Sequence, residues 1–339
     1  MGKYDGLMGR YFSNRERFAD LMNGIIFDGR QVIDPQSLER EAGDYIETEQ
    51  IVEADKKKEH GFQKSINVKR RYRDLKMQSN QDGLSRIFAL ENQSVVDYTM
   101  PLRCMEYDFL EYQEQINNLK ESYKMNKTPL QGSEKLCGIK KKDRILPVYT
   151  VCLYHGEEEW DGPRSLFDMI DVSDKNSEKK IFSDYPMRLY CINEQQNFQV
   201  FHTEVRQFFQ ALFYRKDKAK LKDLIVTSAE YKNLSEETFE MIVKCLGWSE
   251  LWKIRGIFMN KTDEREGYNM CQAVREWREE ERAIGRAEGI RQGIEQMVLE
   301  NLEEQRPEEI IIGKLVRWFS LTQEQAKSYY DKYSGALVR

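Results

Sequence analysis

The sequence has few of the residues from which many active sites are built. Only three histidines occur in 339 residues, and none has a companion at the spacing of a metal site. The six cysteines are spread along the chain without a CxxC pair, which disfavours a zinc site or disulfide framework and favours reduced thiols. Gly-rich phosphate loops and the nucleophile motifs of acyl hydrolases are also missing. NTPases and acyl hydrolases are therefore disfavoured.

Long apolar segments are missing as well. The sequence contains no run of about 18 apolar residues, so we expect no transmembrane helix and no membrane contact. Its first residues, MGKYDGLMGRYF, lack the apolar segment of a signal peptide. Hydrophobic residues make up 40% and charged residues 33% of the chain, a composition typical of a well-charged globular protein. We therefore expect a cytoplasmic protein whose length allows two folded units.

The net charge of −5 conceals two basic segments. Glu53–Lys76 contains nine Lys or Arg against four acids, and Lys120–Arg144 contains eight against three. Each segment therefore carries a charge of about +5. Such segments attract polyanions, although charge alone is more often explained by a solvated surface.

The first 93 residues contain patterns of both helix and strand. Residues 14–27 show helical spacing of apolar residues, whereas the polar segment 34–60 is predicted as a helix or a loop. Alternation predicts strands over Tyr72–Gln78 and Arg86–Gln93. The turn-forming cluster Ser79–Gly83 between them indicates a hairpin.

The remaining chain is predicted to be mostly helical. A long helix over Val95–Met125 precedes a buried strand over Leu146–Tyr154, and a further strand is expected near 187–192. Helices are then expected over 205–222, 235–259, 263–305, 307–321 and 322–333. We predict an α/β domain over 1–200 and a helical region over 201–339, which has an accessory or assembly role and could support a homo-oligomer.

Two carboxylates on the predicted hairpin form the candidate site. Asp74 and Glu91 each lie on the strand face opposite the large apolar residues, and Gln93 points the same way as Glu91. Carboxylates from paired strands can bind a hard cation such as Mg²⁺, which can activate water for attack on phosphate. Alone, this pattern is weak, because acids on paired strands are usually solvent-facing.

Three further residues are candidates on their position alone. Lys76 shares the predicted face of Asp74 and could supply positive charge, although a surface lysine is the more common explanation. Asp20 could be an additional site acid or a structural acid of the first helix. Arg103 could grip a phosphate or pair within its own helix.

Longer segments around these residues are more specific than the triplet. They are RFADLMNGIIFDGRQVI (Arg17–Ile33), RRYRDLKMQ (Arg70–Gln78), FALENQSVVDYTMPLRCMEYDFLEYQEQI (Phe88–Ile116) and VYTVCLYHGEEEWDGPRSLFDMI (Val148–Ile170). With these segments the sequence resembles the recombination-promoting nuclease (Rpn) family, also described as PD-(D/E)XK nuclease family transposases. The resemblance covers most of the chain and is least distinctive over 35–65 and 170–260.

The resemblance implies a restriction-endonuclease-like core, a mixed sheet flanked by helices, that cleaves DNA with Mg²⁺ or Mn²⁺. Asp74 matches the acid of the family's second strand, Glu91 the acid of its ExK or ExQ motif, and Gln93 the third position of that motif. Arg103 and Tyr107 match the helix that follows. The departure from the wider superfamily is Gln93 in place of lysine, since an amide can orient water but supplies no positive charge.

The resemblance also makes DNA the expected partner. Candidate contacts to it are Arg103, Tyr107 and the basic residues Lys69, Arg70 and Arg71. The main hypothesis is a DNA endonuclease that promotes recombination or transposition. The alternatives are a catalytically weak or inactive nuclease fold that binds DNA or a partner, and a helical scaffold that works through residues 263–333.

Overall fold

The computed structural model describes residues 5–41, 44–54, 62–195, 197–261 and 266–334, and for the hairpin of β2 (Asp44–Ala54) and β3 (Phe62–Tyr72) it describes the backbone alone. The chain divides into two compact units, Met1–Met270 and Cys271–Arg339.

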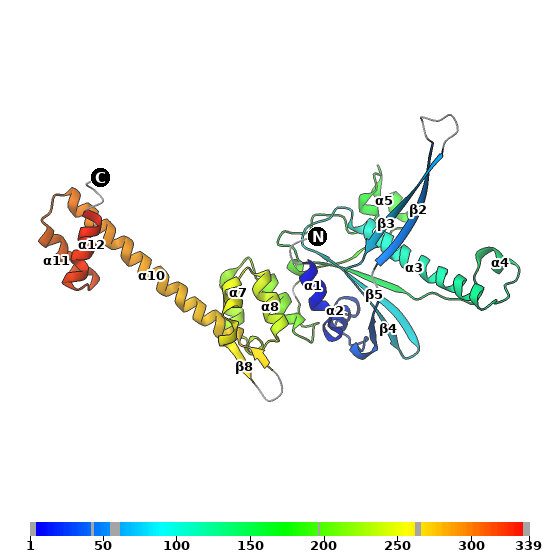
Figure 1. Ribbon diagram of the computed structural model, residues 1–339, viewed down its shortest axis with the longest axis horizontal. Helices are drawn as coiled ribbons and strands as arrows, with labels where there is room; N and C mark the ends of the chain where they lie inside the picture. Colours follow the sequence, from blue (N-terminus) through cyan, green and yellow to red (C-terminus); the bar gives the residue numbers. More distant parts are fainter. Residues whose placement is uncertain (1–4, 42–43, 55–61, 196, 262–265, 335–339) are drawn as a thin grey trace. The chain divides into compact units, whose positions relative to one another are not determined.

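A five-stranded mixed sheet forms the centre of the first unit (Figure 1). Its strands are β1 (Leu38–Arg40), β4 (Leu75–Gln81), β5 (Leu84–Gln93), β6 (Val148–Tyr154) and β7 (Arg188–Cys191), and they lie side by side in the order β1-β4-β5-β6-β7. The pairs β1–β4 and β4–β5 are antiparallel, whereas β5–β6 and β6–β7 are parallel. The expected mixed sheet in an α/β unit is therefore present.

The predicted hairpin is present, with a shorter turn than expected. Its first strand begins at Leu75 rather than at Tyr72, so Asp74 lies just before it. Strand β4 continues to Gln81, and Asp82 and Gly83 alone form the turn. Both turn residues have positive φ, 53° and 73°, as the two-residue turn that matches the twist of paired strands requires. Ser79 instead pairs with Arg86 in the ladder, so the polar cluster was wrongly counted as turn.

The long helix α3 (Met100–Met125) packs on one face of the sheet, and its predicted C-terminal end is confirmed. On this face the side chain of Thr150 in β6 donates a hydrogen bond of 2.5 Å to Asp108 of α3. Thr150 pairs with Ala89, two residues from Glu91, and residues paired or two apart share a face. Helix α3 therefore covers the face that carries the candidate acids.

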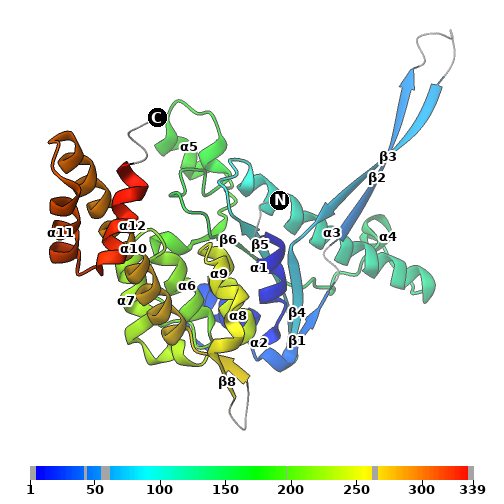
Figure 2. The ribbon, with the colours of Figure 1, turned by 60° about the vertical axis from the view of Figure 1, so that its left-hand side comes forward.

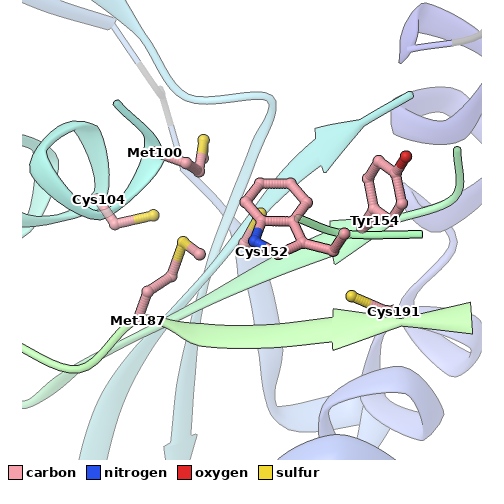
Figure 3. Close-up of a cluster of buried hydrophobic side chains, with 7 residues drawn as sticks. Met100, Cys104, Cys152, Tyr154, Met187 and Cys191 are labelled. Carbon is pink, nitrogen blue, oxygen red and sulfur yellow. The ribbon is translucent and has the colours of Figure 1, made fainter. Parts of the chain in front are cut away.

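Sulfur-containing and aromatic side chains fill the space between α3 and strands β6 and β7. In Figure 3, Met100 and Cys104 of α3 approach Cys152 and Met187 near the sheet. The same cluster extends to Tyr154, whose ring lies edge-on to Trp160 at 5.1 Å between centroids. All seven side chains in the cluster are buried, so the helix is held on the sheet by apolar packing as well as by polar contacts.

Helices from both ends of the first unit cover the other face (Figure 2). They include α1 (Asp5–Phe12), α2 (Arg15–Phe27), α6 (Val205–Phe213) and α8 (Glu236–Cys245). Tyr190 of β7 contacts the rings of Phe201 and Phe209, and Phe209 also contacts Phe12 of α1. This aromatic packing joins α6 to α1 and the sheet. The first compact unit ends at Met270, whereas the border was predicted at 200.

Several predicted helices are shorter or absent. Segment 34–60 forms no α-helix where it is described; it contains a 3-10 turn at Pro35–Ser37, strand β1 and the whole of β2. The expected helix over 205–222 is interrupted before Asp217, which caps α7 (Lys218–Thr227). The one over 235–259 stops before Gly247, where φ is +71°. Glycine adopts such a backbone conformation without steric cost.

The second unit contains most of α10 (Met270–Glu303), with α11 (Glu308–Phe319) and α12 (Gln323–Ser334). Its own buried core consists of Ile294, Val298, Ile311, Leu315, Ala326 and Tyr333. The prediction of helices in this region is confirmed, although α10 begins at Met270 rather than 263 because Glu266–Tyr268 forms strand β9.

Asp20 of α2 has a structural role in the first unit. Its buried carboxylate accepts hydrogen bonds from the backbone N–H groups of His202 and Thr203, both at 2.8 Å, and from the Thr203 hydroxyl at 2.6 Å. These bonds tie α2 to the segment that leads into α6. These contacts agree with the structural interpretation of Asp20, and its role as a further site acid stays a prediction.

We predict that Asp20→Asn lowers the free energy of unfolding by about 2 kcal/mol, because the new amide N–H₂ faces donors and leaves buried groups unsatisfied. Urea denaturation followed by circular dichroism measures the loss. Glu16→Gln, an exposed change in the same helix, is the matched control and should leave stability nearly unchanged. Equal stability of the two variants would contradict the assigned role.

Candidate functional site

The two candidate acids lie at directly opposed positions on neighbouring strands. Leu75 pairs with Leu90 in the antiparallel β4–β5 ladder, and the same register places Asp74, the residue just before β4, opposite Glu91. The Asp74 carboxylate also accepts a hydrogen bond of 2.7 Å from the backbone N–H of Asn92. The register and the bond to Asn92 place Asp74 next to β5, in agreement with the expected shared face. The convergence of the two carboxylates on one cation stays a prediction.

Glu91 is a buried carboxyl group without a hydrogen bond. Its side chain is 1% exposed, and neither carboxylate oxygen has a hydrogen-bond partner in the part of the chain that the structure describes. Burial, and after it the negative charge of Asp74, raises the pKa of Glu91 to about 8, although Arg73 and Arg103 act in the opposite direction. Buried carboxylates normally accept several hydrogen bonds, so this one has unused capacity for a ligand.

Of the two α3 residues expected near this acid, Arg103 lies beside Glu91, whereas the contacts of Tyr107 are to arginines. The Arg103 guanidinium lies 3.8 Å from the Glu91 carboxylate and is anchored by a shorter contact of 2.6 Å to Asp97. Tyr107 is buried and hydrogen-bonds to Arg103. Because Arg103 is about one-third exposed, it is positioned to contact both the acid and a ligand from outside.

Gln93 is the last residue of β5 and is half-buried. It pairs with Tyr154, and its backbone carbonyl accepts a hydrogen bond of 2.9 Å from the N–H of His155. Since it lies two residues after Glu91, its side chain points to the same face. This backbone contact fixes the position of the strand end.

Lys76 shares the face of the acids but is paired with other carboxylates. Its ammonium group lies 2.9 Å from Glu111 of α3 and 3.3 Å from Glu41, and the lysine side chain is 6% exposed. A buried ammonium with two carboxylate neighbours is neutralised locally. Its contribution of positive charge to the site stays a prediction. The two ion pairs do not favour it, because they already use the charge of the ammonium group.

A buried arginine that the sequence analysis did not single out lies next to Asp74. The Arg73 side chain is fully buried and donates hydrogen bonds to Thr150 at 2.6 Å and to Asp108 at 2.7 Å. Its guanidinium also lies 5.4 Å from the centre of the Tyr107 ring. The hydroxyl of Tyr185 donates to the second oxygen of Asp108 at 2.5 Å. The one sequence signal for this network was the position of Arg73 beside the candidate acid.

The predicted contacts Lys69, Arg70 and Arg71 lie on β3, opposite Glu47, Ile46 and Tyr45 in the ladder. Their side chains lie outside the described part of the structure, so their role stays a prediction.

The donor set fits a cation in part. Within the described ranges, no group of three or more His, Cys, Asp or Glu side chains is arranged to hold a metal ion. Asp74 and Glu91 are a pair of like charges that raises the pKa of Glu91. A divalent cation between two such carboxylates removes their repulsion and uses the unpaired oxygens of Glu91. With two protein ligands, Mg²⁺ keeps several waters, which is its usual preference.

Comparison with known proteins adds no family to this description. The chain matches no model of a protein family, and neither curated proteins nor solved structures show a significant similarity to it. Within the ranges described, no helix combines the length and the apolarity needed to cross a membrane.

The raised pKa of Glu91 leads to a pH-dependent stability. Between pH 4.5 and about 8 the folded protein retains a proton on Glu91 that the unfolded chain releases. Stability must therefore fall as pH rises through this window, by up to about 1.4 kcal/mol per pH unit from this group. Glu91→Gln cannot ionise, so we expect its urea-denaturation profile to lack this decline.

The comparison is made by urea denaturation at several pH values, with Glu159→Gln, an exposed acid, as the control. Asp74→Asn should give a smaller decline than the wild type, because it removes a negative charge that raises the pKa of Glu91. Parallel stability profiles for the wild type and Glu91→Gln would contradict the assignment.

Proposed function

We propose that this protein is a metal-dependent endonuclease that hydrolyses phosphodiester bonds of DNA and promotes recombination or transposition. The observation that carries the proposal is the buried, unbonded carboxylate of Glu91 opposite Asp74. Two arginines lie next to this pair, Arg103 with a partly exposed side chain and Arg73 in the interior. Acids and cations gathered in this way suit a phosphate ester and a bound cation.

The arrangement of the sheet supports a restriction-endonuclease-like core. Two antiparallel pairs are followed by α3 and a parallel strand, which agrees with the mixed sheet that the family resemblance implies. Asp74 then lies directly before the second strand of that core, and Glu91 lies in the third. The sequence resemblance and the sheet topology are independent reasons for the same proposal.

Each residue has a separate part in the proposed reaction, in which water attacks phosphorus and the bond to the leaving oxygen breaks. Asp74 and Glu91 would hold the metal ion, which when bound neutralises phosphate charge and lowers the pKa of water. Arg103 would bind a phosphate oxygen, since its guanidinium is partly exposed and pre-positioned by Asp97. Gln93 would orient the attacking water through its amide.

A second candidate function is DNA or partner binding without cleavage. Gln93 supplies no charge, and the ammonium of Lys76 is already paired with Glu111 and Glu41. These two observations favour a weak or inactive site, and a cleavage assay separates the two functions. For the second unit, with its own core, we propose a role in assembly through its helices.

We predict that purified protein cleaves plasmid DNA with Mg²⁺ or Mn²⁺ and that a chelator stops it. Asp74→Asn and Glu91→Gln should abolish cleavage even at raised metal concentration, because each removes a negative charge that the cation requires. Agarose-gel time courses measure the rates, and Glu159→Gln is the control. Cleavage by both site variants at the wild-type rate would assign the activity to other residues or to a contaminant.

Changes at Gln93 should affect the rate without affecting metal affinity. Gln93→Ala should slow cleavage by about 10²-fold, the effect of losing one positioned hydrogen bond in a transition state. Gln93→Lys should retain or raise activity if the ammonium reaches the same position.

Lys76→Ala should leave the rate near that of the wild type if Glu111 and Glu41 already neutralise the ammonium group of Lys76. Metal titration beside the time course separates binding from chemistry.

A further inference from the structure

The second basic segment of the sequence forms one continuous surface region. Residues 120–144 comprise the last turns of α3, the short helix α4 (Ser133–Cys137) and the loops around it. We call this region the lysine lobe. In Figure 1 it lies at the C-terminal end of α3, beyond the edge of the sheet. It contains eight Lys or Arg and three acids.

A pocket of about 520 Å³ opens in the lobe. It is lined by Lys120, Tyr123, Lys124, Lys127, Thr128, Leu130, Lys135, Leu136, Cys137 and Gly138. No acid contributes to this lining. The Leu136 side chain is 93% exposed, so the pocket offers an apolar surface among its ammonium groups.

The cations of the lobe have no acidic partners of their own. Within the described part of the chain, none of its eight basic side chains forms an ion pair. Two of its acids are already bonded. Asp143 accepts from the Tyr123 hydroxyl and the backbone N–H of Lys140, both at 2.7 Å, and Glu134 accepts from the N–H groups of Gln131 and Lys141. The lobe therefore has an uncompensated positive charge.

The length of α3 indicates what kind of anion fits. Arg103, beside Glu91, and Lys124 are 21 residues apart in this helix, which at a rise of about 1.5 Å per residue separates them by about 30 Å. A single small anion cannot contact both. A DNA duplex can, because about nine base pairs at about 3.4 Å each cover this length.

We propose that the lysine lobe binds the phosphate backbone of a DNA duplex whose other part reaches the acid pair. The choice of DNA among polyanions rests on the proposed function, whereas the charge and the pocket do not. Lysines contact phosphates without reading bases, so the lobe sets affinity and not sequence preference. Binding releases counterions and must weaken steeply with salt.

The test uses the full-length chain, a fluorescein-labelled duplex of about 20 base pairs and a chelator that prevents cleavage. The lobe variant replaces Lys120, Lys124, Lys127 and Lys135 by glutamine. Fluorescence anisotropy should show a Kd of the lobe variant at least tenfold higher than that of the wild type at about 100 mM salt. Its log Kd should also depend less steeply on log salt concentration. The control variant replaces four exposed lysines elsewhere, Lys175, Lys179, Lys180 and Lys218, and should bind within twofold of the wild type.

Duplex length and ligand class make the test specific. A duplex of about 6 base pairs is too short to contact the lobe and the acid pair together, so the wild type should bind it more weakly than one of about 12. Equal affinity for the two lengths would overturn the proposed span. Wild-type affinity in the lobe variant would overturn the proposal. So would a lobe-dependent binding of anionic lipid vesicles or polyglutamate that exceeds the binding of DNA.

The two proposals fail in different ways. If the wild type never cleaves but the lobe variant loses DNA binding, the nuclease proposal fails and the lobe proposal stands. If cleavage needs Asp74 and Glu91 but the lobe variant binds and cleaves normally, the lobe proposal fails.

Discussion

The buried guanidinium of Arg73 fixes the relation between the sheet and α3 on which the candidate site depends. It is fully enclosed, yet it bonds to Thr150 of β6 and to Asp108 of α3, and Tyr107 packs against it. A buried charge is stable only with such partners, and removing one of them typically costs 3–5 kcal/mol. The helix consequently has one position on the sheet, and that position brings Arg103 to Glu91.

In the same layer between sheet and helix, two carboxyl groups, Glu91 and Asp74, lie opposite each other. Arg73 and Asp108 satisfy one another, whereas Glu91 is buried opposite Asp74 without a hydrogen bond among the described residues. Proteins usually satisfy buried polar groups everywhere except where function requires otherwise. The contrast between the paired carboxylate of Asp108 and the unpaired one of Glu91 is the physical reason for treating this part of the layer as a site.

The positive charge at the site and the positive charge in the lysine lobe come from different kinds of side chain. At the acid pair, positive charge comes from arginines that other residues already hold in position, such as Arg103 bonded to Asp97. In the lobe, most lysines are exposed, Lys120 and Lys140 being half-buried, and none forms an ion pair among the described residues. Fixed arginines suit a defined contact to one phosphate, and mobile lysines suit a loose contact to many. Helix α3 joins the two regions along a single axis.

The sequence by itself determined the local elements and the facing of the acids. Alternation around Asp74 and Glu91 fixed which side each carboxylate takes, and apolar spacing identified α2, α3 and the helices of the second unit. It did not reveal β2 within the segment 34–60, because that strand depends on pairing with β3. Only the tertiary structure decided that Lys76 pairs with Glu111 and that Glu91 stays unbonded. The reason is physical: periodicity is set by neighbours along the chain, whereas ion pairing and desolvation depend on residues that folding brings together from distant segments.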